Sequence, residues 1–430
     1  MPPPQFLVEI PPHRRAEREY ALAVLLGEWL RAPYTVRVVD DLSSTRLRLA
    51  DGSSDRVIVM PDRLMSPTTV WLSEGSLPTS MPAVAAPDWA GLDETLPLLF
   101  PVDERAPQLT QHDGNELSLG FDLLGSLFFM LTRYEEYVRG DARDAHDRFR
   151  AQDSIAGRCN WLRWPILDMY LHAFIGVLKL TWPRVDLEPT GSERVLLSHD
   201  VDHPASPMLW HGRQRFRIMG GDMARRRNVG LALRRASSFV SRPGALSRLD
   251  PFNTFEFLMR TSETAGIRST FFFLAGNSEL PHGTAYRLED NWATCLIRQI
   301  AGRGHAIGLH GSYDSYLDAT QMAAEWAVLA DACRELPAGA LRRAIRQHYL
   351  RWRAGATWPA QEQAGLLVDE TLGYADAIGY RAGTARSFTA FDLTLGRPLA
   401  VRVRPLHIMD VTVVNHHAHD LDGAIDGTNE

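Results

Sequence analysis

Helix-like and strand-like segments alternate through the second half of the chain, and this alternation limits the fold more than any other feature. Helical periodicity marks 254–266, 291–304 and 320–336, and short apolar runs at 269–276 and 305–310 stand between them. Strands separated by helices form βαβ units in a mostly parallel sheet, so the sequence predicts an α/β fold. The last predicted elements are a helix at 359–366 and strands at 378–383 and 399–405.

The first half of the chain mixes the same kinds of element less regularly. Its predicted elements are strands at 34–40 and 56–60 and helices at 119–138 and 160–182. The second of these helices is expected to break near Pro165. The polar, turn-rich segment 183–193 then separates the two halves. We therefore expect a smaller α/β domain at 1–190 and a second domain at 191–430.

The composition excludes several classes of protein. The 430 residues are 45% apolar and 23% charged, and the net charge of −6 gives no reason to expect nucleic acid as a partner. Three distant cysteines (Cys159, Cys295 and Cys333) fit neither a disulfide framework nor a thiolate zinc site. The first residues do not resemble a secretory signal, and no apolar run approaches the roughly 18 residues that a membrane span needs. We expect a soluble, cytoplasmic protein without stable membrane insertion.

The first motif with chemical potential is HDVDH at 199–203, directly after the apolar run 194–197. Residues two apart on an extended chain point to the same side, so Asp200 and Asp202 can face one site. Neighbouring carboxylates repel each other unless a cation or a shared proton lies between them. The same pattern also fits a polar turn after a strand, with Asp202 capping a helix.

The second motif is HGSYD at 310–314, at the end of the predicted strand 305–310. The spacing of four places His310 and Asp314 on one face if the segment turns helically. Imidazole and carboxylate groups are good ligands for a divalent metal such as zinc, although this pair alone also fits a surface histidine near a solvated aspartate. The two motifs together supply one base, Asp200, and three metal ligands, Asp202, His310 and Asp314. Three protein ligands with an open position are typical of a catalytic zinc site.

These motifs resemble those of the NodB-like polysaccharide deacetylases over about 190–413. SHDVDHP (198–204) is similar to the family's first motif, which implies Asp200 as the catalytic base and Asp202 as a metal ligand. HGSYD is similar to the second motif, which implies His310 and Asp314 as the other ligands, and IRSTFFFLAG (267–276) resembles the strand between the two motifs. The resemblance implies a distorted (β/α) barrel and a hydrolase that removes N-acetyl groups from an amino sugar, in a polysaccharide or a saccharide precursor. The expected cofactor is a divalent metal, with Zn²⁺ as the first choice.

Two further segments carry a resemblance. IRQHYLRW (345–352) resembles the third motif, whose arginine holds the catalytic aspartate, and this implies Arg346, with Arg381 as a second candidate. A surface salt bridge is the alternative role for either arginine. Upstream, the sequence 128–154 resembles an uncharacterised domain that precedes many of these deacetylases. We interpret its residues Tyr134, Glu135 and Glu136 as the acidic face of a helix.

One expected part of the family pattern is missing. The last motif is a Leu-x-His near the C-terminus, whose histidine acts as the general acid. The histidines that do not fit this motif are His407, His416, His417 and His419. We therefore expect a shortened or divergent C-terminal end and leave the general acid unassigned, which weakens activity because positioned proton transfer typically contributes about 10²–10⁴-fold.

Two alternative functions stay open at this point. The chain fits a catalytically impaired saccharide-binding protein of the same fold, or a hydrolase of another non-peptide C–N bond. The arginine-rich segment 213–248 fits either contact with an anionic sugar nucleotide or lipid-linked phosphate, or a solvated helical insertion. Beyond a saccharide substrate, the sequence specifies no partner and no oligomeric state.

Overall fold

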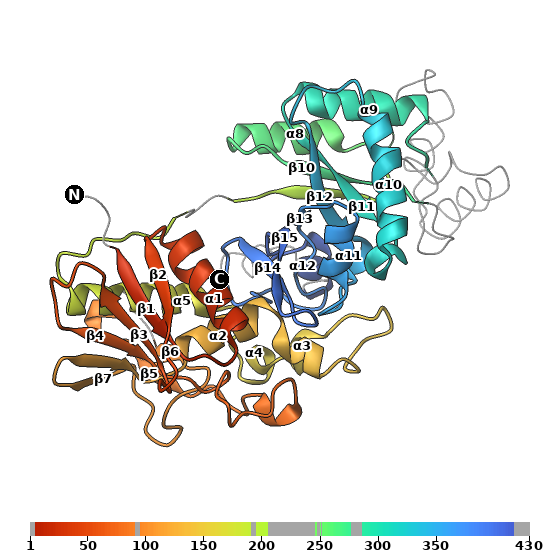
Figure 1. The fold of residues 1–430 in the computed structure, drawn as a ribbon. Coiled ribbons are helices and arrows are strands. Elements are labelled where there is room, and N and C mark those ends of the chain that lie inside the picture. The colour runs from red at the N-terminus through yellow and green to blue at the C-terminus, as the bar shows by residue number, and fades with distance from the viewer. Residues whose placement is uncertain are drawn as a thin grey trace. The chain divides into compact units, whose positions relative to one another are not determined.

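The computed structural model divides the chain into two compact units, whose elements are drawn in Figure 1. Unit 1 comprises Met1–Glu193, Leu350–Glu362 and Asp369–Glu430, and unit 2 comprises Arg194–Tyr349 and Gln363–Val368. The structure describes residues 5–90, 95–190, 195–204, 246, 250, 252–276 and 286–416. The first division lies close to the predicted boundary between residues 190 and 191. Most of the chain after Tyr349, however, belongs to unit 1 and not to the second predicted domain.

Unit 1 is built on a mixed six-stranded sheet with the order β2-β1-β3-β4-β8-β7. Its strands are β1 (Phe6–Ile10), β2 (Tyr34–Val38), β3 (Thr45–Leu49), β4 (Val57–Met60), β7 (Thr110–Asp113) and β8 (Glu116–Leu119). β1 pairs in parallel with β2 and antiparallel with β3, and β4 pairs in parallel with β8. Two hairpins complete the strands of unit 1: β5 (Ala83–Ala85) with β6 (Thr95–Pro97), and β14 (Phe388–Asp392) with β15 (Arg397–Val403).

The helices of unit 1 pack an apolar core against these strands. They are α1 (Arg15–Leu22), which continues as a π-helical segment (Ala23–Trp29), α2 (Leu123–Leu131), α3 (Tyr134–Val138), α4 (Ile155–Arg158), α5 (Ile166–Thr181), α11 (Thr357–Gln363) and α12 (Asp410–His416). Every residue of α2 is buried, because its sequence is almost entirely apolar. Asp122 caps α2 by accepting the N–H of Gly125 at 2.6 Å.

The C-terminal hairpin β14–β15 completes the core of unit 1. The hydroxyl of Tyr20 in α1 donates to the carbonyl of Thr389 at 2.7 Å. The ring of Phe391 lies 4.8 Å from that of Tyr20 and 5.1 Å from that of Phe128, so residues far apart in sequence share one aromatic cluster. The segment 369–403 is therefore an integral part of unit 1.

Unit 2 contains a parallel sheet whose strands follow the order β12-β11-β10-β9. Its elements are β9 (Ser198–Val201), α8 (Phe255–Thr264), β10 (Thr270–Leu274), α9 (Asn291–Gly302), β11 (Ala306–Gly311), α10 (Ala319–Ala332) and β12 (Leu341–Gln347), with β13 (Val368–Asp369) where the chain returns to unit 1. β10 and β11 are buried along their whole length, as expected for parallel strands covered on both faces. α9 and α10 both pack on β11 (Figure 1).

The predicted α/β fold is confirmed, and the helices and strands predicted between 254 and 336 occur within a few residues of their expected bounds. The sheets formed by the described residues are open, and none of them closes into a barrel. Within this same part of the chain, no helix combines the length and the apolar character that a bilayer span requires.

Several predicted elements differ from the structure. The predicted helix 119–138 is two helices, because Arg133 adopts a left-handed conformation with φ 55° between α2 and α3. The predicted helix 160–182 begins only at Ile166, with Pro165 as the N-cap of α5, so the proline precedes the helix and does not break it. The strand predicted at 378–383 is wrong, since that segment forms turns, whereas β12 and β14 were not predicted. β12 begins with the charged sequence LRRAIRQ, which hides the apolar pattern of a buried strand.

The strand before the first motif also begins later than expected. Val195 and Leu196 of the apolar run are 70% and 62% exposed, and β9 consists of Ser198–Val201. Thr270 of β10 pairs with Ser198, so the ladder includes the motif itself and not the residues before it. Asp200 is therefore part of a strand.

A buried ion cluster joins the two parts of the unit 1 sequence. The interpretation of Tyr134, Glu135 and Glu136 as an acidic helix face is wrong, since all three are buried. The carboxylate of Glu136 accepts hydrogen bonds from Arg381 at 2.9 and 2.5 Å and from Arg133 at 2.9 Å. Burial by itself raises the pKa of Glu136, but these two guanidinium groups outweigh it and lower the pKa to about 2. Glu136 is therefore a buried anion balanced by two cations.

Removal of this anion is expected to destabilise unit 1 strongly. Glu136→Gln leaves Arg133 and Arg381 buried without their counter-ion, and breaking a buried pair costs about 3–5 kcal/mol. Urea unfolding followed by tryptophan fluorescence measures the loss. Glu19→Gln is the matched control, because Glu19 pairs with Arg15 at the surface, where such pairs contribute at most about 1 kcal/mol. Equal losses in the two variants would contradict the ion cluster as a source of stability.

The stabilisation by Glu136 should also depend on pH in a defined direction. The pKa of this group lies at about 2 in the folded protein against an ordinary value of 4.5, so the folded state holds the proton less tightly than the unfolded state. The contribution of about 3 kcal/mol is therefore complete above pH 4.5 and is lost as the pH falls toward 2. We expect the difference in unfolding free energy between wild type and Glu136→Gln to shrink over that interval. A difference that stays constant there would refute the assignment.

Candidate metal centre

The carboxyl ends of the parallel strands of unit 2 carry the candidate site. Asp200 lies in β9 and Asp202 follows its last residue, His310 lies in β11, and His348 follows β12. The ladder pairs Phe272 with Asp200, and it pairs His310 with both Leu274 and Arg346 on its two sides. Parallel strands end at a common edge, so these polar residues meet although they are far apart in sequence.

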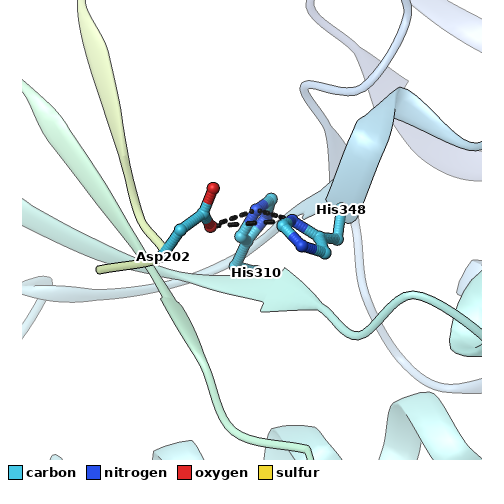
Figure 2. A group of neighbouring side chains, drawn as sticks. All are labelled: Asp202, His310 and His348. Carbon is cyan, nitrogen blue, oxygen red and sulfur yellow. Dashed lines mark hydrogen bonds and ion pairs between the residues drawn. The ribbon is translucent and has the colours of Figure 1, made fainter. Parts of the chain in front are cut away.

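Three side chains form a compact group at this edge. Asp202, His310 and His348 each offer one ligand atom, and these atoms lie within 4.8 Å of one another. Nε2 of His310 is 3.1 Å from Oδ1 of Asp202 and 3.0 Å from Nδ1 of His348, which in turn is 3.6 Å from the same carboxylate oxygen. Figure 2 shows the carboxylate and the two imidazole rings pointing toward one another.

The backbone of β12 fixes which nitrogen of His310 faces this group. Nδ1 of His310 lies 2.7 Å from the carbonyl oxygen of Arg346, which can only accept a hydrogen bond. Nδ1 therefore carries a hydrogen, and Nε2 is directed at Asp202 and His348. Metal-binding histidines in proteins are usually oriented in this way by a hydrogen bond at the second ring nitrogen.

The charges in the group are strongly coupled. Burial opposes ionisation of Asp202, but His310 and then His348 outweigh it and lower the pKa of Asp202 to about 2. Burial also acts to lower the pKa of His310, yet the carboxylates of Asp200 and Asp202 raise it. For His348, burial and the neighbouring His310 lower the pKa to about 4. These shifts favour a protonated His310 beside an ionised Asp202, and they favour a neutral His348.

A second pair of charged residues stands beside this group. Nη1 of Arg346 in β12 is 3.6 Å from Oδ1 of Asp200, and Nη2 donates to the hydroxyl of Ser198 at 2.7 Å. The guanidinium also lies over the ring of Phe272 at 5.1 Å. These contacts place the predicted arginine next to the predicted base, and both side chains are mostly buried.

A buried tyrosine fixes the end of β9. The hydroxyl of Tyr286 donates to the carbonyl of Val201 at 2.8 Å and accepts the N–H of Leu274 at 2.9 Å. It bridges the last residues of β9 and β10 at the point where the chain leaves the ladder. The position of Asp202, the next residue after Val201, is therefore determined by the sheet and not by a loose turn.

The structure brings together four of the five predicted site residues: Asp200, Asp202, His310 and Arg346. The fifth, Asp314, is not in the metal-binding group, since it is exposed and begins the short 3₁₀ turn Ser315–Leu317. The spacing argument fails because β11 extends to Gly311, so His310 belongs to a strand and the two residues do not share a helical face. His348 takes the place predicted for Asp314.

The sequence analysis does not identify His348 as a ligand, although its spacing from Arg346 indicates it. It stands two residues after Arg346 in the same motif, and residues two apart near a strand share a face. The spacing indicates a shared face only if 341–347 is a strand, and the sequence analysis does not predict β12.

The other candidates lie elsewhere. Arg381 belongs to unit 1, where Glu136 binds its guanidinium, so it does not hold Asp200. His407 also belongs to unit 1. Its ring centre lies 4.6 Å from that of Tyr380 in a tilted arrangement, and its Nε2 contacts the carbonyl of Thr384 at 3.2 Å. The predicted arginine-rich segment 213–248, apart from residue 246, lies outside the described residues, as do His417 and His419.

The chemistry of the group fits a divalent metal. Oδ1 of Asp202 is buried and accepts no well-aligned hydrogen bond from the described residues, although two imidazole nitrogens face it. Three electron-pair donors that close together need a proton or a cation between them. Two imidazoles and one carboxylate suit zinc and other first-row metals, and three protein ligands leave a position open. The residues that would hold the metal are Asp202, His310 and His348.

Comparison with known protein families gives a match for the first part of the chain. Residues 6–183 match a family of unknown function (DUF7033). This match covers less than half of the chain and lies within unit 1, so it does not include the candidate site. No curated protein matches the sequence.

The choice between His348 and Asp314 as a ligand can be tested by metal binding. We expect His348→Ala to weaken Zn²⁺ binding by more than about 100-fold, because loss of a direct ligand should cost more than loss of a supporting partner. Asp314→Ala should bind Zn²⁺ as wild type does, because this residue is exposed and outside the group. Competition with a chromophoric chelator measures both affinities. Weakened binding in Asp314→Ala with normal binding in His348→Ala would restore the prediction made from the sequence.

Proposed function

We propose that this protein is a metal-dependent hydrolase that removes N-acetyl groups from an amino sugar, in a polysaccharide or a saccharide precursor. The observation that carries the proposal is the meeting of Asp202, His310 and His348 beside the Asp200–Arg346 pair at one edge of the sheet. The site contains a possible ligand set, an acid outside that set for proton transfer, and a cation that orients this acid. The resemblance of the first three motifs to NodB-like polysaccharide deacetylases supports the choice of substrate.

The metal, for which Zn²⁺ is the first choice, supplies Lewis-acid activation of the amide carbonyl and of water when it is bound. Asp200 accepts a proton from the attacking water. Arg346 orients Asp200, because its guanidinium lies 3.6 Å from the carboxylate. The contact of Arg346 with Ser198 holds the guanidinium in place.

The reaction balances with water as the only co-reactant. Water oxygen forms a bond to the acetamide carbon, and the bond between this carbon and the sugar nitrogen breaks. The proton accepted by Asp200 ends on the departing amine, so the products are acetate and an amino sugar. Groups that transfer a proton in this way typically contribute about 10²–10⁴-fold to the rate.

Several finer statements belong to the proposal. By resemblance, unit 2 is an open relative of the distorted (β/α) barrel of NodB-like proteins. A cytoplasmic location favours a saccharide precursor as substrate over finished cell wall. The general acid of the family stays unassigned, because His407 belongs to unit 1 and serves another contact there.

A saccharide-binding protein without turnover is the second candidate function. The sequence leaves this alternative open, since none of His407, His416, His417 and His419 fits the Leu-x-His motif that supplies the proton donor in the family. The Asp200–Arg346 pair favours an enzyme, because a binding protein has no need for a buried acid held by an arginine beside a metal group.

Substitution of the base tests the enzyme directly. We expect Asp200→Asn to lower acetate release from N-acetylated saccharides by about 10²-fold or more while Zn²⁺ stays bound, because Asp200 is outside the ligand group. Acetate and metal are measured in the same samples across a panel of N-acetylated saccharides, with Asp314→Asn as the control that removes a nearby exposed charge. Activity retained in Asp200→Asn would reject the assignment of the base. Wild-type protein that binds metal but releases no acetate would favour another amide substrate, and protein that does neither would favour the saccharide-binding alternative.

A further inference from the structure

A buried glutamate from α10 holds the turn that follows His310. Glu325 is 4% exposed, and its Oε2 accepts the backbone N–H of Ser312 at 3.0 Å. Its Oε1 accepts the hydroxyl of Ser312 and the side-chain amide of Gln321, the latter at 3.1 Å. Gln321 also donates to the hydroxyl oxygen of Ser312 at 2.9 Å. Two residues after His310, the chain is thus fixed to α10 through both its backbone and its side chain.

The same polar network reaches the end of β12. The hydroxyl of Ser315 lies 2.9 Å from the carbonyl of Ser312 and 3.2 Å from Oε1 of Gln347. Gln347 immediately precedes His348 and contacts the sulfur of Met322 in α10 at 3.4 Å. All of these side chains are buried or half-buried, so the network connects α10 to the residues next to two of the three proposed ligands.

Two glycines at the strand ends make room for the network. A Cβ atom on Gly276, just after β10, would lie 2.4 Å from Oε1 of Glu325. A Cβ atom on Gly311 would lie 2.2 Å from Oε1 of Gln347 and 3.0 Å from the hydroxyl of Ser315. The ends of β10 and β11 therefore pack with bare backbone against the polar side chains, and larger residues there would displace them.

Burying the polar side chains of this network costs free energy of desolvation. A carboxyl group in the interior requires several hydrogen-bond donors to offset the loss of water, and here the donors are the neutral groups of Ser312 and Gln321. Apolar side chains would fill the space between α10 and β11 without that requirement. Unlike apolar packing, the hydrogen bonds of the network fix the position of the chain next to the proposed ligands.

We propose that Glu325 is a positioning residue of the metal centre, which sets the spacing of His310 and His348 through Ser312 and Gln347. The inference rests on the proposed metal binding at Asp202, His310 and His348 and extends it to α10, which supplies none of the ligands. Glu325 acts at a distance from the metal and does not touch the substrate. Supporting partners of this kind typically change metal affinity by about 10–100-fold.

Metal affinity in three variants tests the role of Glu325. We expect Glu325→Ala to weaken Zn²⁺ binding by about 10–100-fold, and Glu325→Gln by less, because glutamine keeps one acceptor oxygen for the N–H of Ser312. Ser312→Ala should also weaken binding, since it removes one contact and leaves the backbone bond intact. Asp331→Asn is the matched control, because Asp331 is an exposed acid on the same helix and its loss should not alter the affinity. The affinities come from competition with a chromophoric chelator.

Substitution by Co²⁺ separates positioning from general stability. The visible absorption bands of bound Co²⁺ report ligand geometry, so they should shift in Glu325→Gln and Ser312→Ala and stay unchanged in Asp331→Asn. If Glu325→Ala does not fold, the two milder variants decide the question. Wild-type affinity and an unchanged Co²⁺ spectrum in both would overturn the proposal while leaving the metal centre intact. Failure of wild-type protein to bind any metal would reject both the metal centre and this inference. Acetate release is measured separately and tests the deacetylase proposal.

Discussion

The hydrogen-bonded register of four parallel strands is the constraint on which the site depends. Asp200 is opposite Phe272, and His310 stands between Leu274 and Arg346 in adjacent ladders. A shift by one residue in any of these ladders would turn the affected side chains to the other face of the sheet. A shift would also have to repack the side chains of β10 and β11, which are buried along their whole length. The position of the polar site is therefore a consequence of the apolar strands that flank it.

Two of the buried charged clusters among the described residues are balanced in different ways. In unit 1, Glu136 is neutralised by arginines, whose charge does not vary with pH in the range where proteins fold, so the cluster is permanently satisfied. In unit 2, Asp202 faces two imidazoles, which can lose their protons and present lone pairs. Glu136, held between two arginines, has a structural role, whereas Asp202, which faces two histidines, can take part in the exchange of a proton for a metal. The cations next to Glu136 and Asp202 thus distinguish a structural cluster from the proposed ligand group.

The sequence predicts the α/β class and most elements of unit 2, because its helices are strongly periodic and its central strands are short apolar runs. It does not predict β12, whose charged first half masks the strand, and this one omission explains why His348 was missed. The sequence indicates Asp314 as the third ligand because a spacing of four suggests a shared helical face. In the structure, His310 lies in a strand and Asp314 precedes a 3₁₀ turn. The sequence also does not predict the burial of Glu135 and Glu136, because Arg381, a partner of Glu136, lies 245 positions away. Local patterns identify residues that carry chemistry, but pairings between distant segments decide which of them meet.

β12 organises both halves of the candidate site. The carbonyl of Arg346 orients His310, the guanidinium of the same residue lies beside Asp200, and His348 follows two positions later as a proposed ligand. A ligand set drawn only from the first two motifs would depend on β9, β11 and a local turn. With His348 as the third member, ligand geometry and the position of the base are coupled through one strand, so a displacement of β12 changes both at once. Gln347 lies between Arg346 and His348 and takes part in the buried network of Glu325, so α10 contacts the same strand. Under the proposed function, the base and the metal must keep a fixed relation to one water molecule. β12 would couple the two, because its Arg346 contacts Asp200 and its end is followed by the proposed ligand His348.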